Sequence, residues 1–139
     1  MSNSLDLRNA LLVKSFASIG LPYPTKYPSS SFTEQPDNAP WLRVTPIYGE
    51  PIPLAYSTTD RIDGILQIDV FTPKNSGDII AHQICDTVRQ ALPVNGEKRT
   101  SGNVSVQFRS VGMSGAPDGD TWDHAIIRAT FYAFVDRND

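Results

Sequence analysis

The chain has 139 residues, 40% of them hydrophobic and 19% charged, and its 12 basic against 15 acidic side chains give a formal net charge of −3. This length and composition predict one globular domain over residues 1–139, and the absence of a basic cluster argues against a surface that wraps nucleic acid. No apolar run approaches the ~20 residues of a membrane span, the first residues lack a secretory-signal pattern, and a single cysteine excludes an intrachain disulfide, so we expect assembly in a reducing cytoplasm.

The first predicted element is a helix over residues 4–19. Ser4 is a candidate N-cap, and Asp6 lies in the first turn, where the helix dipole favours a negative charge. Gly20 can adopt the left-handed conformation that ends many helices, and Pro22 prevents the helix from continuing. The apolar side chains recur at the helical period and predict one buried stripe, which consists of Leu5, Leu11, Leu12, Phe16 and Ile19.

A proline-rich arm, residues 21–40, follows this helix. The chain has 11 prolines, and eight of them fall between Pro22 and Pro53. Each proline removes a backbone donor and favours extended geometry in the residue before it. Because Tyr23 and Tyr27 would seek burial, we predict an extended arm at the border of one domain and not a linker between two. Proline along a sheet edge also blocks unwanted strand pairing.

Four later segments alternate polar and apolar residues, as strands with one covered face do. The last segment is apolar on much of its second face as well, where Tyr132 and Phe134 lie, so we expect it to be central in the sheet or to lie against a partner. Arg109 and Arg128 fall in the polar positions, and cross-strand pairing with Asp69 is expected. The predicted strands cover residues 41–47, 62–72, 103–111 and 124–135.

A second helix is predicted over residues 76–92, between the second and third strands, with Ser76 as its cap. Its apolar stripe includes Cys85, which we therefore expect to pack as a small hydrophobe and not to act as a reactive thiol. The element order fits helices packed on one face of a mixed or antiparallel sheet. We predict an α+β fold with about four to five strands and two helices.

Two long segments between strands, residues 48–61 and 112–123, exceed the usual length of hairpin loops, so we expect both to project beyond the sheet. The second holds Asp118, Asp120 and Asp123, but its spacing departs from the EF-hand pattern. A solvated loop tip is favoured over a calcium site. The functional alternative is a negatively charged lip on a surface.

The remaining candidates for chemistry form no catalytic constellation. His82 lies on the polar side of the second helix and His124 opens the last strand, so a solvated and a strand-edge position are expected. Neither a phosphate-binding glycine pattern nor a nucleophile elbow is present. We predict a protein that is not an enzyme and that holds no cofactor or metal.

Three stretches carry a resemblance to a known family. They are IGLP at residues 19–22, APWLRV at 39–44, and GILQIDVF at 64–71, which runs into a Thr-Pro pair and the second helix. A polar loop followed by the apolar strand near the C-terminus completes the pattern. The layout resembles the tail terminator (tail completion) proteins of long-tailed bacteriophages, of the lambda minor tail protein U type.

This resemblance implies a structural virion protein of the phage tail, assembled in the host cytoplasm as a homohexameric ring. The ring would cap the tail tube at its set length and present its other side to head-completion or neck proteins, with DNA passing through the lumen without specific binding. The alternatives are a head–tail connector (neck) subunit or a cytoplasmic module that binds a peptide or small ligand on its sheet. The candidate contact residues are Tyr48, Glu50, Tyr56, Asp60, Arg61, Met113, Asp118, Asp120, Trp122, Arg128, Tyr132 and Phe134.

Overall fold

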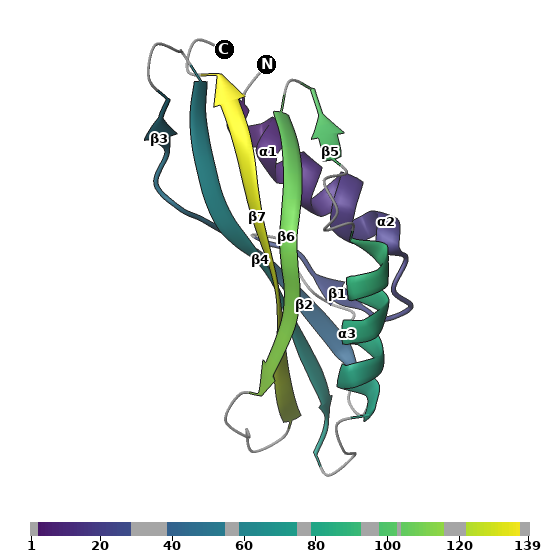
Figure 1. Ribbon diagram of the computed structural model, residues 1–139. Helices are drawn as coiled ribbons and strands as arrows, with labels where there is room; N and C mark the ends of the chain where they lie inside the picture. Colours follow the sequence, from purple (N-terminus) through teal and green to yellow (C-terminus); the bar gives the residue numbers. More distant parts are fainter. Residues whose placement is uncertain are drawn as a thin grey trace.

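The computed structural model describes residues 3–28, 39–54, 59–74, 79–92, 98–102, 104–115 and 122–136. Its strands are β1 (Thr25–Lys26), β2 (Trp41–Tyr48), β3 (Ile52–Pro53), β4 (Thr59–Pro73), β5 (Lys98–Ser101), β6 (Val104–Gly115) and β7 (Trp122–Asp136). They form one sheet of seven strands in the order β1-β2-β4-β7-β6-β5, with β3 paired to β4 (Figure 1). β1 runs parallel to β2, and the other pairs are antiparallel.

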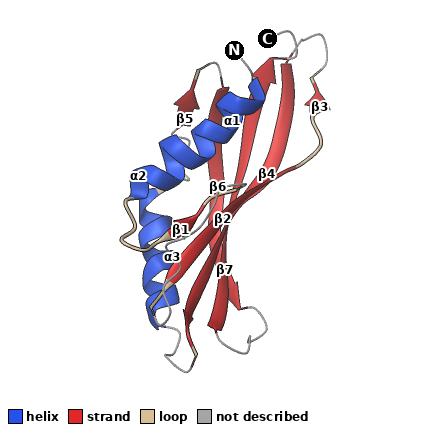
Figure 2. Cartoon of the chain, turned by 180° about the vertical axis from the view of Figure 1, so that it is seen from behind, coloured by secondary structure: helices blue, strands red, loops and turns tan. Residues whose placement is uncertain are grey.

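The helices cover only one face of this sheet. The first helical run comprises α1 (Asn3–Leu11), the π-helical turn η1 (Leu12–Phe16) and α2 (Ala17–Ile19), and the second helix is α3 (Ile79–Ala91). Figure 2 shows both in front of the strands, whereas Figure 1, from the opposite side, shows the strands in front. We call the uncovered side of the sheet the open face. α1 begins and β7 ends at the same end of the molecule (Figure 1).

The core lies between the helices and the covered face, as the alternation predicted. Phe108 of β6 and Phe131 of β7 are both 1% exposed and meet edge to face at 6.4 Å. β7 is central, between β4 and β6, which confirms the expectation from its two apolar faces. The other buried strand side chains include Leu42, Val44, Leu66, Ile68, Val70, Val104, Val106, Ile127, Ala129 and Ala133.

The prediction of four to five strands is wrong because three strands are too short for alternation to show. β1 and β3 have two residues each, and β5 has four. Backbone pairing with a long neighbour is enough to order such short strands, whatever their side chains.

The two long loops are also shorter than predicted. Inside residues 48–61, β2 extends to Tyr48, β3 pairs with β4, and β4 begins at Thr59. Inside residues 112–123, β6 extends to Gly115 and β7 begins at Trp122, and the residues between them lie outside the described ones. The reason is the ladder between β4 and β7, which pairs 15 residues of each strand without regard to polarity.

The first helix departs from its predicted stripe. Leu5 is 51% exposed, and Ser4 lies inside the helix and not at its cap. The π-helical turn adds a residue to one turn, which rotates the residues before it relative to those after it, so one 3.6-residue stripe cannot describe the whole run. Gly20 ends the run in the left-handed conformation, with φ 72°, as predicted. The second predicted cap, Ser76, lies outside the described residues.

Prolines remove outward amide groups from one edge of the sheet. The backbone amide of Leu42 donates to the carbonyl oxygen of Pro24 at 2.9 Å and therefore points away from β4. The amide groups of alternate residues of β2 point to the same outer edge, and Pro46, which has no amide hydrogen, occupies one of these positions. In β3, the amide of Leu54 donates toward β4, to Thr59 at 3.1 Å, so the neighbouring Pro53 points outward. A further strand cannot complete its hydrogen-bond ladder on this edge.

Candidate functional site

The open face carries several of the predicted contact residues. Residues directly opposite each other on paired strands share a face, and the register places Arg61 opposite Phe134 and Gln107 opposite Tyr132. All four point away from the helices, because the alternate positions of these strands form the core. The predicted contact residues on the open face are Arg61, Trp122, Arg128, Tyr132 and Phe134.

Other predicted contact residues lie elsewhere. Asp60, 8% exposed, and Met113 point to the covered side, opposite Val135 and Ile127 respectively. The sequence predicted loops at both positions, but the strands continue through them, and the two residues occupy alternate positions that face the helices. Three of the predicted residues fall outside the described part of the chain: Tyr56, Asp118 and Asp120.

Two arginines hold the ring of Tyr132 between them. The guanidinium carbons of Arg61 and Arg109 lie 4.8 Å and 4.9 Å from the ring centroid. Asp63 joins both, with Oδ1 2.8 Å from Nε of Arg61 and 3.6 Å from Nη2 of Arg109. The Tyr132 hydroxyl donates to Oε1 of Gln107. These contacts fix two cations and an aromatic ring on the surface of three neighbouring strands.

An aromatic stack crosses the other half of the open face. The ring of Phe71 stacks on Trp41 at 4.2 Å and on His124 at 4.5 Å, with interplanar angles of 13° in both pairs. Beneath it Asp69, 1% exposed, accepts from Nε of Arg43 at 3.2 Å and lies 2.9 Å from Nε2 of His124. His124 lies near the start of β7, as expected, and its ring packs between Phe71 and the buried carboxylate of Asp69.

The predicted pairing of Asp69 with Arg109 and Arg128 is wrong for reasons of register. Arg109 occupies a bulge in β6 and reaches Asp63, six residues away from Asp69 along β4. Arg128 lies opposite Gln67 and donates to Oγ of Ser114 at 2.6 Å. Alternation predicts on which face of the sheet a side chain lies, but not which residue of the neighbouring strand lies opposite it.

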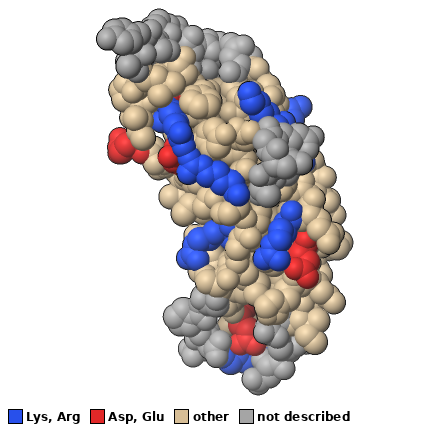
Figure 3. Space-filling model, viewed as in Figure 1, with Lys and Arg blue, Asp and Glu red and all other residues tan. Residues whose placement is uncertain are grey.

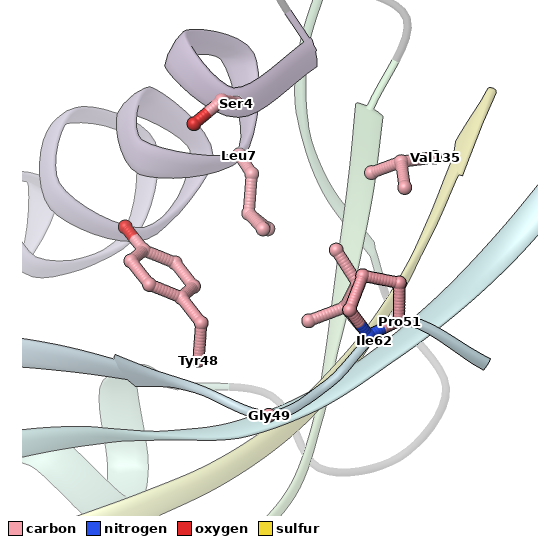
Figure 4. A pocket seen from close by; sticks show the side chains of 7 residues that line it. All are labelled: Ser4, Leu7, Tyr48, Gly49, Pro51, Ile62 and Val135. Atoms are coloured by element: carbon pink, nitrogen blue, oxygen red, sulfur yellow. The ribbon is translucent and has the colours of Figure 1, made fainter. Parts of the chain in front are cut away.

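A pocket that the sequence did not indicate lies where α1 begins. It is a mostly apolar cavity of about 400 Å³, and Figure 4 shows Leu7, Ile62 and Tyr48 pointing into it from three different elements. Burial raises the pKa of the Tyr48 hydroxyl, and the charge of Arg8 opposes this shift. Glu50, which lies between Gly49 and Pro51 in the chain, is exposed. The lining residues are Ser4, Leu7, Tyr48, Gly49, Pro51, Ile62 and Val135.

Among the described residues that line this pocket, the polar side chains are those of Ser4 and Tyr48, and they form no acid–base pair. Within the described residues, no three His, Cys, Asp or Glu side chains are placed to hold a metal ion, and no helix is long and apolar enough to cross a membrane. Cys85 is 3% exposed in the apolar stripe of α3, which confirms its predicted packing, and burial raises the pKa of its thiol. His82 is exposed on the same helix, as expected.

Comparison with known proteins agrees with this fold. A solved structure with 22% sequence identity aligns over 96% of both chains with a TM-score of 0.73, which shows the fold. No curated protein matches the chain. The model of the family described as phage tail terminator protein matches residues 7–128. The chain belongs to this family. The match begins within α1 and ends within β7, so it covers most of the fold. This tail terminator is a structural protein of the phage tail, as the resemblance predicted.

Proposed function

We propose that this tail terminator assembles into a homohexameric ring that caps the tail tube and joins it to the head-completion or neck proteins. The observation that carries the proposal is the open face, which presents arginine, tyrosine and tryptophan side chains. The chain belongs to a family of structural tail proteins, so a surface of this kind is expected to bind other proteins. These residue types dominate the binding energy of protein interfaces. Phe134, 43% exposed on the central strand, adds an apolar anchor.

A ring also suits the places where contacts can form. The prolines on the β2–β3 edge oppose strand addition on that side of the sheet, which favours faces and pockets as contact surfaces there. The open face and the apolar pocket are different surfaces of one subunit, and contacts between different surfaces of identical subunits close into rings when the rotation allows it. Tail tube protein and neck protein would then meet the two sides of the ring, and DNA would pass through its lumen without specific binding.

The proposed lumen would be lined by carboxylates, and Asp118 and Asp120, which lie outside the described residues, are the candidates for this role. Their carboxylates would repel the phosphates of passing DNA and keep it from adhering. Replacing both by lysine should then slow genome ejection from the particle, measured as the rate of DNA release after receptor addition. Unchanged ejection would count against this part of the proposal.

Complementation of a phage that lacks this chain tests the proposed function. The intact chain should restore capped tails of one set length, seen by electron microscopy of purified tails. A variant that lacks residues 115–120 should fold but leave tails uncapped, and Lys14→Ala, an exposed change on the helical side, should complement as the wild type does. Capped tails of normal length in the absence of the chain would refute the proposal.

A further inference from the structure

We infer that the open face is a docking surface for an acidic surface of a different protein of the particle. The inference rests on the proposed function for the statement that this chain meets other tail or neck proteins. It adds which side of the subunit binds such a partner and which charge the partner carries.

Positive charge extends over the whole width of the open face. Figure 3, viewed onto this face, shows Lys and Arg side chains across its middle. Each strand in the order β1-β2-β4-β7-β6-β5 contributes one basic side chain from a described outward position, and neighbouring strands lie about 4.8 Å apart, so the charges span about 24 Å. In this strand order they are Lys26, Arg43, Arg61, Arg128, Arg109 and Lys98.

The described acidic side chains on the same face neutralise only part of this charge. Asp69 is 1% exposed and accepts from Arg43, so a partner would not meet its carboxylate. Asp63 is shared, because its Oδ1 lies 2.8 Å from Arg61 and 3.6 Å from Arg109. Two guanidinium groups with one carboxylate between them keep a positive charge that a partner carboxylate can neutralise.

Three of the arginines are held in position before a partner binds. The ring of Tyr132 fixes Arg61 and Arg109, whose guanidinium carbons lie 4.8 Å and 4.9 Å from its centroid. The exposed Arg128 donates to the neutral hydroxyl of Ser114 at 2.6 Å, which orients its side chain and leaves its charge in place. Because ordered side chains lose little freedom on binding, carboxylates of a partner bind them at a lower entropic cost.

Exposed apolar side chains between the charges favour a protein over a nucleic acid as the partner. Ile47, Ile52 and Phe134 are 45%, 52% and 43% exposed, and the register places the last two opposite Arg61. Phosphates would pair with the cations but leave these side chains in water. A protein surface that carries both carboxylates and apolar groups desolvates them and pairs with the arginines at the same time.

The described remainder of the same chain does not supply this acidic surface. Outside the open face, the described residues include five basic and five acidic side chains, and two of the acidic ones, Asp6 and Asp60, are buried. Asp86 and Asp123 already lie within 3.5 Å of a basic side chain. Charge complementarity therefore indicates a different protein and not a second copy.

Binding in solution tests the charge of the partner. The probes are a labelled synthetic peptide of glutamate and leucine and a labelled DNA oligonucleotide, titrated with the full chain in about 50 mM and about 500 mM salt and followed by fluorescence anisotropy. The peptide should bind more tightly than the DNA, and high salt should weaken its binding. Arg128→Glu should raise the dissociation constant of the peptide about tenfold, and Arg128→Gln should raise it by less.

Lys14→Glu is the matched control, since it makes the same charge change on the exposed helical side and should stay within about twofold of the wild type. Thermal unfolding of each variant verifies that the fold is retained. Absence of peptide binding, DNA that binds at least as tightly as the peptide, or equal effects of Arg128→Glu and Lys14→Glu would each overturn the inference.

Photo-crosslinking in assembled particles tests the identity of the occupant. A phage that lacks this chain is complemented with Phe134→p-benzoylphenylalanine, and the crosslinked peptides are identified by mass spectrometry. The expected product joins Phe134's position to a segment of a different virion protein in which Asp and Glu outnumber Lys and Arg, whereas the same reagent at position 14 should not give this product. A crosslink to a second copy, to DNA or to a basic segment, or no crosslink, would assign the face otherwise and overturn the inference.

The two proposals fail in different ways. If tails are capped but the expected crosslink does not form, the docking surface is wrong while the terminator function stands. If tails are capped without the chain, the terminator function is wrong, and the peptide titration still decides whether the open face selects an acidic protein surface.

Discussion

Gly64 of β4 provides a sharp test of the packing between the central strands. A Cβ at this position would collide with the carbonyl oxygen of Ile47 and would lie 2.7 Å from Cζ of Phe131. The first neighbour is backbone of β2, which cannot rotate away, and the second is a ring that is 1% exposed in the core. Alanine at this position therefore has to separate β2 from β4 or displace the ring.

We expect Gly64→Ala to lower the free energy of unfolding by about 3 kcal/mol, the upper part of the range for overpacked cores. For a chain of this size that is a fall in the unfolding midpoint of about 10 °C. Urea denaturation and thermal unfolding measure both. Combining Gly64→Ala with Phe131→Leu should cost at least about 1 kcal/mol less than the two single changes together, because the smaller side chain yields space to the new methyl group.

Gly112 of β6 is the matched control, since a Cβ there would meet nothing within 4 Å. Gly112→Ala should change the stability by less than about 1 kcal/mol. The reasoning fails if Gly64→Ala keeps its midpoint within about 3 °C of the wild type, or if the two alanine variants lose equal stability.

Three further outcomes follow from the described contacts. Because burial raises the pKa of the Cys85 thiol and shields it, iodoacetamide at pH 8 should modify it at least about a hundredfold more slowly in the native chain than in urea, and equal rates would contradict this. Replacing Pro46 and Pro53 by valine restores two outward amide groups and should increase light scattering on incubation at high concentration, and unchanged scattering would contradict this. Asp69→Ala removes the acceptor for three polar side chains and should cost about 3 kcal/mol in urea titrations, against less than about 0.5 kcal/mol for the exposed Asp86→Ala.

Features set by local sequence were predictable. Gly20 ends the first helical run because a residue without a Cβ adopts positive φ at little cost. Alternation identified the core faces of β4, β6 and β7, and the two apolar faces of β7 predicted its central place. Each of these depends on neighbours within a few positions of the chain.

Features set by pairing between strands were not predictable. Arg109 meets Asp63 because of a bulge and a register that only the folded sheet defines. The pocket beside Tyr48 is assembled from several elements, so no single stretch carries its signal. The arginines of the open face had a signal that the whole-chain charge of −3 hid, since summing charges separately over the outward positions of the predicted strands would have found Arg109 and Arg128 on one side.

A subunit that caps a tube, as proposed above, has to associate without growing further, and the edge of the sheet bears on that requirement. The proline edge at Pro46 and Pro53 denies an incoming strand the amide donors that would let a sheet extend without limit. The proposed ring would also limit growth, because head-to-tail contacts that close into a ring leave no unpaired surface. The rotation between neighbouring copies in the proposed ring would then set the number of subunits, and therefore the width of the lumen.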